Sequence, residues 1–236
     1  HTLEMLKCLD FQGHLYAIDV DPLELPRTQA RLESLGYGSE ILSVRQMNFA
    51  GINQIVAESG PLNFILADLG VSSMQIDNPK RGFSFKTAGP LDLRLNPNKG
   101  RSAAERLQTI SQYELEELLR EIADEPNAKA IASAIVSEIR RGAEVATTTQ
   151  LQQIIKNTVK SIHGSNSSEE IKKSCQRCFQ ALRIDVNNEF GVLYEFLEKL
   201  PDALAAGGRV AILSFHSGED RLVKKSFQQL FRDGEY

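Results

Sequence analysis

Short apolar runs alternate with helix-forming segments over the first 70 residues of this 236-residue chain. The apolar runs are 14–19, 41–45 and 64–67, and the segments between them, 22–35 and 52–58, have helical character. Strands and helices that alternate at this spacing form a parallel sheet whose strands are joined by right-handed crossovers. The pattern therefore predicts an α/β fold for this part of the chain.

Two of the apolar runs end in an acid, Asp19 for the first and Asp68 for the third. In open parallel sheets, ligands bind beyond the carboxyl ends of the strands. A carboxylate roughly 20 residues after a glycine-rich turn commonly binds the ribose of a nucleotide-like cofactor, which would place that turn at or just before His1. Asp19 is therefore interpreted as a ribose ligand. The alternative is a helix-capping acid, although Asp21 is better placed for capping.

The longest stretch without a regular period follows Asp68 and extends to Arg94. A loop of this length is uncommon unless it is functional or disordered, and its glycines and two phenylalanines, Phe83 and Phe85, argue against disorder. Between residues 74 and 106 it carries seven Lys or Arg against three acids. Such a composition suits phosphates and an unstacked base. A solvated loop anchored by two phenylalanines is an equally consistent interpretation.

Four amphipathic helical segments then follow one another, without a strand-like run between them. They cannot belong to an alternating sheet. We therefore expect an inserted helical domain over 99–182, and an α/β domain made of 1–98 and 183–236.

The strand-and-helix pattern resumes with a buried strand over 209–215, which ends at His216. We expect the glycines at 207 and 208 to terminate the helix before it, and a last helix to begin near Asp220. A histidine at a strand end faces the ligand crevice, where it can contact a base or substrate group. The alternative is a structural hydrogen-bonding residue that ties two loops together.

Bulk composition excludes several classes of protein. No apolar run approaches the length of a membrane span. A net charge of −4 gives no global support for nucleic-acid binding, so only the local charge of the loop supports it. Three cysteines do not make a disulfide framework, which favours a reducing compartment. Cys175 and Cys178 form a C-x-x-C pattern without further ligands nearby in sequence, and we interpret them as core residues; no metal site is predicted.

Six motifs, in order along the chain, carry a resemblance to one family. They are DLGVSSMQ at 68–75, RGFSF at 81–85, GPLDLR at 89–94, FQALR at 179–183, VNNE at 186–189 and SFHS at 214–217, the last followed by EDR at 219–221. The chain resembles the bacterial small-subunit (16S) ribosomal RNA cytosine-N4 methyltransferases of the RsmH/MraW type. It departs from that family at Gly218, where leucine is usual, and at Phe190, where leucine usually follows the glutamate.

The resemblance implies a Rossmann-like S-adenosylmethionine-dependent methyltransferase sheet with an inserted helical domain. It implies methyl transfer from S-adenosylmethionine to the N4 amine of a cytidine in the decoding region of small-subunit ribosomal RNA. The implied cofactor contacts are His1 (the last residue of a Gly-Gly-His turn), Asp19, Phe49, Asp68 and Gln75. Asp19 would bind the ribose, and Phe49 would lie near the adenine.

Position and resemblance together give the remaining hypotheses about the site. Asp68 positions the cofactor or the amine, Ser72 shapes the pocket, and His216 contacts the target nucleotide. The predicted substrate contacts are Arg81, Phe83, Phe85 and Arg94, with Phe83 or Phe85 packed on the cytosine.

The expected partner is small-subunit ribosomal RNA or its particle, and the protein is expected to be a monomer or homodimer that does not bind membranes. The expected location is the bacterial cytoplasm, or an organelle if a targeting peptide precedes His1. Two other functions fit parts of the pattern. An NAD-dependent dehydrogenase would use Asp19 in the same way, and a non-catalytic RNA-binding assembly factor would keep the fold.

Overall fold

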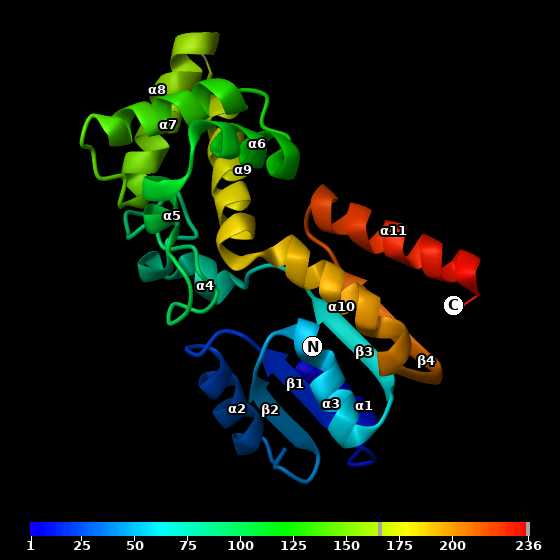
Figure 1. Ribbon diagram of the computed structural model, residues 1–236. Coiled ribbons are helices and arrows are strands. Elements are labelled where there is room, and N and C mark those ends of the chain that lie inside the picture. The colour runs from blue at the N-terminus through cyan, green and yellow to red at the C-terminus, as the bar shows by residue number, and fades with distance from the viewer. Residues whose placement is uncertain (165–166, 235–236) are drawn as a thin grey trace. The chain divides into compact units, whose positions relative to one another are not determined.

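A computed structural model describes residues 1–164 and 167–234 of the chain. Within these ranges the chain forms two compact units (Figure 1). The first unit consists of His1–Leu69 and the described residues from Phe190 onward, and the second unit is Gly70–Glu189. Among the residues described, no helix has both the length and the apolar character needed to cross a membrane.

The strands of the first unit form two parallel pairs. β1 (Leu15–Asp19) pairs with β2 (Leu42–Gln46), and β3 (Leu62–Asp68) pairs with β4 (Leu204–Leu213). The four predicted strands and their parallel pairing are thus confirmed, except that β4 ends at Leu213 instead of 215 and, contrary to the prediction of a buried strand, holds no buried residue. The described residues hold two two-stranded sheets instead of the continuous sheet that the sequence predicted.

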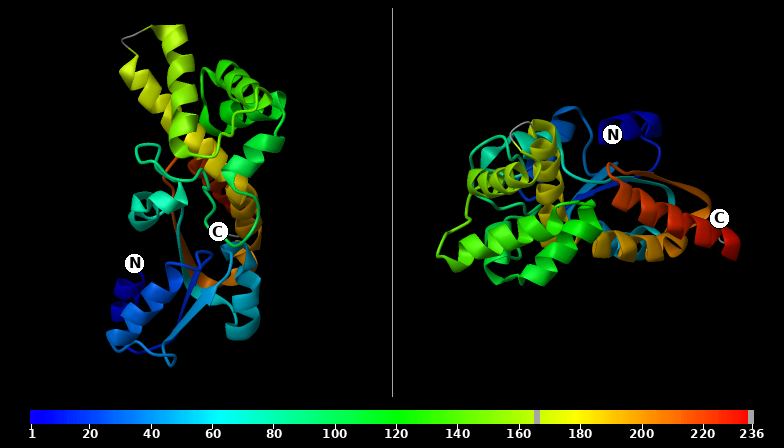
Figure 2. Two further views of the ribbon diagram at one scale, coloured as in Figure 1. Left: turned by 90° about the vertical axis from the view of Figure 1, so that its left-hand side faces the viewer. Right: turned by 90° about the horizontal axis from the view of Figure 1, so that it is seen from above.

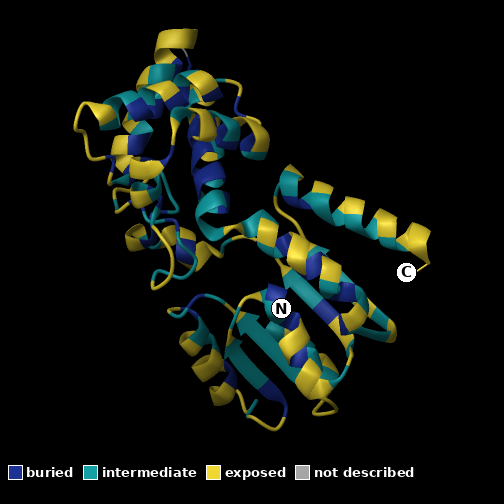
Figure 3. Ribbon diagram, in the orientation of Figure 1, coloured by how far each residue is buried: buried dark blue, intermediate teal, exposed yellow. Residues whose placement is uncertain are grey.

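Helices pack against both strand pairs. α1 (Thr2–Leu9) and α2 (Leu25–Ser34) share an apolar cluster with β1 and β2, centred on Leu6, Leu32 and Leu42. A second cluster joins β3 and β4 to the 3-10 turn η1 (Phe49–Gly51) and to helices α3 (Ile52–Ser59), α10 (Glu189–Ala203) and α11 (Ser217–Asp233). Most of α11 is exposed or half-buried (Figure 3), and Glu219 is its one fully buried residue.

The glycines expected to end the helix before β4 instead lie inside that strand. α10 ends at Ala203, and β4 begins at once with Leu204. A Cβ on Gly208 would lie 2.8 Å from the Ala205 carbonyl oxygen and 3.0 Å from that of Leu62. Glycine is therefore required at this position because two backbone segments approach it closely.

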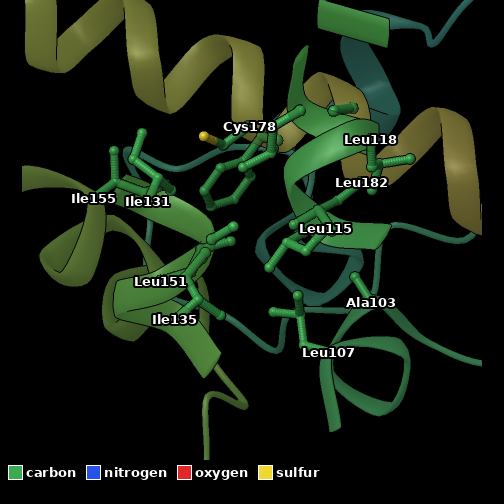
Figure 4. Close-up of a cluster of buried hydrophobic side chains, with 14 of the residues drawn as sticks. Ala103, Leu107, Leu115, Leu118, Ile131, Ile135, Leu151, Ile155, Cys178 and Leu182 are labelled. Atoms are coloured by element: carbon green, nitrogen blue, oxygen red, sulfur yellow. The ribbon is translucent and has the colours of Figure 1, made fainter. Parts of the chain in front are cut away.

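The second unit contains the long loop and a bundle of helices. The loop carries two short turns, α4 (Ser73–Asp77) and η2 (Pro79–Arg81). α5 (Ala103–Thr109), α6 (Gln112–Ala123), α7 (Ala128–Arg140), α8 (Thr148–His163) and α9 (Ser168–Asn187) follow. The last four confirm the predicted helical segments, and Figures 1 and 2 show them packed side by side around an apolar core (Figure 4).

The helical unit is larger than the predicted insertion of 99–182, because the preceding loop packs into the same core. Leu91 and Leu93 are about as buried as the helical core residues, at 1% exposure each. The hydroxyl of Thr148 donates to the Thr87 carbonyl at 2.8 Å, and the amide of Asn187 donates to that of Leu93 at 2.7 Å. These bonds fasten the later part of the loop to α8 and α9.

Candidate active site

The candidate site of the first unit is the edge at which its parallel strands end. β1 ends at Asp19 and β3 ends at Asp68, and both residues are exposed. In the registers of the two pairs, Asp19 lies beside Gln46 and Asp68 lies beside Leu213. The residues that follow these positions therefore lie beyond the carboxyl ends of their strands, where ligands of parallel sheets bind.

Asp19 is oriented by the turn that follows it. Its Oδ1 accepts a hydrogen bond from the backbone N–H of Asp21 at 2.8 Å. Asp21 is fully buried, and its own Oδ1 accepts from the N–H of Leu23 at 2.8 Å. Asp21 thus closes the turn that leads to α2, whose N-cap is Glu24. The carboxylate of Asp19 is exposed at the strand end, and ribose binding by this residue remains a prediction.

Phe49 follows the end of β2 and begins the turn η1. The Asn48 side chain accepts from the N–H of Ala50 at 2.9 Å, which fixes the backbone of this turn. The half-buried ring of Phe49 packs edge-to-face on Phe196 of α10, with 5.1 Å between the centroids. A fixed aromatic ring at this edge provides an apolar surface for a planar group.

His1 and Asp68, both predicted to contact the cofactor, are neighbours in the structure. The Nε2 atom of His1 lies 3.4 Å from Oδ2 of Asp68, and both side chains are about half exposed. His1 is also the N-cap residue of α1. The start of α1 therefore lies against the end of β3, as expected if both segments border one ligand site.

His216 is the N-cap residue of α11, and both nitrogens of its ring lie close to polar groups of Glu219. The Nδ1 atom of His216 accepts from the Glu219 N–H at 3.4 Å, and its Nε2 atom lies 3.2 Å from Oε1 of that glutamate. The other oxygen of Glu219 accepts from the N–H of Phe215 at 2.8 Å. The ring of Phe190 lies 5.7 Å from the imidazole, measured between centroids. These contacts belong to the capping motif of α11, and they do not show His216 tying two loops together. Contact with a nucleotide remains a prediction.

Ser72 and Gln75 form a capping box at the start of α4 in the second unit. The Ser72 hydroxyl accepts from the Gln75 N–H at 3.3 Å, and Oε1 of Gln75 accepts from the Ser72 N–H at 2.8 Å. Ser72 is exposed, whereas Gln75 is buried. The side-chain oxygen of Gln75 therefore shapes the turn after Asp68, and a cofactor contact by this residue remains a prediction.

The predicted substrate contact by Arg81 needs correction. Arg81 is only 4% exposed, and its guanidinium donates to the carbonyls of Leu95 and Arg94 at 2.8 Å and 3.1 Å. The same group lies 5.5 Å from the centroid of the Phe83 ring. Arg81 therefore holds two parts of the loop together, because its buried donors need acceptors within the protein.

Phe85 and Arg94 are also engaged within the second unit. The Phe85 ring packs on Phe179 of α9, with 5.8 Å between the centroids. Arg94 forms a two-pronged ion pair with Asp92, at 2.8 Å and 2.7 Å, which raises the pKa of its guanidinium. Phe83 and Phe85 both pack against the helical core. The alternative interpretation of anchoring phenylalanines therefore describes this loop better than direct stacking on a base.

The prediction that Cys175 and Cys178 belong to the core is confirmed. Both are fully buried among the apolar side chains of the second unit, and Figure 4 shows Cys178 in this cluster. Burial raises the pKa of the Cys175 thiol to about 11, with a further contribution from the negative charge of Glu125. Burial also raises the pKa of Cys178 well above its ordinary value.

Sequence reasoning missed Glu219, although its position contained a signal. A side chain that accepts hydrogen bonds at the N-cap, followed three residues later by glutamate, is the spacing of a helix-capping motif. Glu219 stands three residues after His216 and closes that motif. The contact between Phe190 and His216 has no such local signal, because α10 and α11 are joined only through β4.

These features define a class of protein. Parallel strands that end in exposed carboxylates, with a fixed aromatic ring after a neighbouring strand, are typical of α/β proteins that bind a nucleoside-containing cofactor.

Comparison with known proteins makes this class more specific. The model of the MraW methylase family matches residues 1–235. Ribosomal RNA small subunit methyltransferase H 2 of Alkaliphilus metalliredigens is 74% identical over 236 residues, covering 100% of this chain and 68% of that protein. Ribosomal RNA small subunit methyltransferase H 1 of Lachnoclostridium phytofermentans is 64% identical, covering 100% of this chain and 64% of that protein. The chain spans about two thirds of the length of these relatives. It belongs to the MraW methylase family.

Family membership implies a methyltransferase fold that binds S-adenosylmethionine, the methyl donor of this family. The structure itself is mixed α/β, mostly helical with short parallel strands. Family membership adds the class of cofactor. The dehydrogenase alternative loses its support, because its one argument, a ribose-binding Asp19, applies equally to S-adenosylmethionine.

Proposed function

We propose that the complete protein containing this chain transfers a methyl group from S-adenosylmethionine to the N4 amine of a cytidine in small-subunit ribosomal RNA. The observation that carries the proposal is that, within the first unit, Asp19 ends β1, Asp68 ends β3, and Phe49 follows the end of β2. The family match over residues 1–235 supports it. The reported relatives come from bacteria, which favours a bacterial cytoplasmic location for this protein.

The residues of the first unit fit the parts of this cofactor. A ribose presents two hydroxyl donors, and the carboxylate of Asp19 is an acceptor oriented by the Asp21 N–H. The adenine needs an apolar surface, and the ring of Phe49, which packs on Phe196, can provide it. When bound, S-adenosylmethionine supplies a methyl group made electrophilic by the adjoining sulfonium.

Asp68 has the part closest to the chemistry in this proposal. The N4 amine of cytosine is a weak nucleophile, because its lone pair is delocalised into the ring. Transfer then depends on placing the amine in line with the methyl group and on an acceptor that draws on an amine proton. The carboxylate of Asp68 is about half exposed and next to His1, so it can accept a hydrogen bond from the amine or orient the cofactor.

On the RNA side, we propose that exposed cations of the second unit contact phosphates. Arg81 and Arg94 have their guanidinium groups bonded within the loop. Exposed basic side chains of the same stretch are Lys80, Lys86, Lys99 and Arg101. Lysines and arginines at a surface supply most of the sequence-independent affinity for nucleic acids. The complete helical unit is thus proposed to recognise substrate, with Arg81 and Arg94 acting as its internal framework.

The test uses the complete protein with small-subunit ribosomal RNA and S-adenosylmethionine. Asp68→Ala and Asp68→Asn are compared with the wild type for methyl transfer and, separately, for cofactor binding by calorimetry. We expect both variants to lose roughly 100-fold or more in rate, because the geometry or the proton acceptor is lost. Full methylation by Asp68→Ala would exclude this role for Asp68. Tight NAD binding without S-adenosylmethionine binding would exclude the proposed function itself.

A further inference from the structure

Phe215 is a large aromatic residue exposed at the end of β4. It is 69% exposed, and the two residues before it, Leu213 and Ser214, are exposed as well. A single exposed apolar side chain is common at protein surfaces, so the exposure of Phe215 is informative only together with the groups that lie beside it.

The backbone of Phe215 is held on both sides. Its N–H donates to Oε2 of Glu219 at 2.8 Å, and this glutamate is only 3% exposed. The next residue, His216, caps α11, and its ring lies 5.7 Å from that of Phe190, measured between centroids. An exposed ring on a fixed backbone loses little conformational entropy when a ligand packs on it, and this favours binding.

Phe215 also lies at the edge that carries Asp68. In the register of β3 and β4, Asp68 is beside Leu213, and the N–H of Leu69 donates to the Leu213 carbonyl at 3.1 Å. Phe215 is therefore only two residues beyond the position paired with Asp68. Both side chains belong to the first unit, so this placement depends only on the geometry of that unit.

Other aromatic residues considered for base contact are already engaged. Phe83 lies under the guanidinium of Arg81, and Phe85 packs on Phe179. The Phe49 ring packs on Phe196 and is assigned to the adenine in the proposed function. Phe215 differs from these residues. It is exposed at a strand end of the first unit, and the ring contacts described for residues 1–69 and 190–234 include none with its ring.

We propose that Phe215 is the residue on which the target cytosine stacks when it leaves the RNA helix. This inference rests on the proposed function. An extruded base loses its stacking partners, and an aromatic side chain in the enzyme can replace them. The position of Phe215 on the edge of Asp68 would place the stacked base near the carboxylate that we assign to its amine.

The experiment compares four variants of the complete protein in steady-state methylation of small-subunit ribosomal RNA. Phe215→Ala removes the ring, Phe215→Leu keeps apolar bulk, and Phe215→Tyr keeps the aromatic face. Phe231→Ala is the matched control, because Phe231 is similarly exposed, at 73%, near the other end of α11. Cofactor affinity and thermal stability are measured for each variant.

We expect Phe215→Ala and Phe215→Leu to lower kcat/KM for the RNA by roughly 5- to 100-fold, the range that loss of one base-aromatic stack produces. Phe215→Tyr and Phe231→Ala should remain within about 3-fold of the wild type, and cofactor affinity should be unchanged throughout. Wild-type activity in Phe215→Ala or Phe215→Leu would overturn the inference, as would an equal loss of cofactor binding. Absence of N4 methylation by the wild type would instead contradict the proposed function.

Discussion

At the scale of single residues, buried polar groups decide the local geometry of the candidate site. Glu219 contributes one carboxylate oxygen to the Phe215 backbone and places the other beside His216. Arg81 has a comparable role in the second unit, where it donates to two carbonyls of its own loop. Both residues have charges that are costly to bury unless their hydrogen bonds are satisfied.

Replacement of Glu219 tests this role. Glu219→Ala leaves the Phe215 N–H without its acceptor, and we expect it to lower the free energy of unfolding by about 1–3 kcal/mol. Glu219→Gln keeps an accepting oxygen and should cost less. Denaturant unfolding of the complete protein measures both, and equal stability of Glu219→Ala and the wild type would contradict the structural role.

The small residue Gly218 and the large residue Phe190 occupy neighbouring space, so the size of one limits the size of the other. A Cβ on Gly218 would lie 2.5 Å from Cζ of Phe190, so the ring occupies the space of a side chain at position 218. The two departures from the family pattern, glycine for leucine and phenylalanine for leucine, therefore compensate in volume.

A double-mutant cycle tests this compensation. Gly218→Leu alone should destabilise the protein by about 1–3 kcal/mol through overpacking. Combined with Phe190→Leu, it should cost less than the sum of the two single changes, with a coupling of about 0.5–3 kcal/mol. Strict additivity in denaturant unfolding would show that the two positions do not share space.

The buried thiols make a prediction that depends on pH. Cys175 has a pKa raised to about 11, whereas Cys8 is exposed. At pH 9 only about 1% of Cys175 would be thiolate, the form that reacts with alkylating reagents. Mass spectrometry after iodoacetamide treatment of native protein should find Cys8 modified and Cys175 and Cys178 protected until denaturant is added. Rapid modification of Cys175 without denaturant would contradict its burial.

The same pKa shift affects stability. Because the pKa of Cys175 is higher in the folded state than the ordinary thiol value of about 8.5, its contribution to stability is complete below that value. It is lost as the pH rises toward 11. The free energy of unfolding should therefore fall on this alkaline side, and Cys175→Ala should weaken the fall.

At the scale of elements, local sequence signals predicted helices and strands well. Thr147 stands three residues before Gln150, the spacing of a capping box, and the two residues form one at the start of α8. Local signals failed where distant segments decide the structure. The glycines at 207 and 208 resemble a helix end, but the close backbone of Leu62 requires Gly208 within a strand. Arg81 and Arg94 resemble RNA contacts, but carbonyls and a carboxylate of their own loop engage them.

The loop of the second unit offers a matched comparison between buried and exposed cations. Arg81→Ala removes a buried framework residue and should destabilise the protein by about 1–3 kcal/mol. Replacing the exposed Lys80 and Lys86 together by alanine should leave stability unchanged and weaken RNA binding. The slope of log affinity against log salt should fall by about 0.7–0.9 for each lost phosphate contact. An unchanged slope would exclude these lysines from the RNA interface.

At the scale of the whole molecule, the alternation of elements predicted an α/β part and a helical part, and both are present as separate compact units. The boundaries predicted for the helical part, 99 and 182, differ from those of the second unit, Gly70 and Glu189. The reason is that the loop lacks a helical period, yet it buries Leu91 and Leu93 in the helical core. Periodicity detects regular elements, whereas membership of a core depends on distant contacts. The positions of Asp19 and Asp68 at strand ends were predictable, because strand ends are visible in sequence; the framework of Glu219 and Phe190 depended on tertiary packing.

The most direct test of the account identifies the methylated nucleoside itself. The complete protein is incubated with small-subunit ribosomal RNA and S-adenosylmethionine carrying an isotopically labelled methyl group, and the RNA is digested to nucleosides for mass spectrometry. The account predicts labelled N4-methylcytidine with the wild type and its loss with Asp68→Ala. Label on a different atom or nucleoside, or no label with an intact wild-type protein that binds the cofactor, would contradict it.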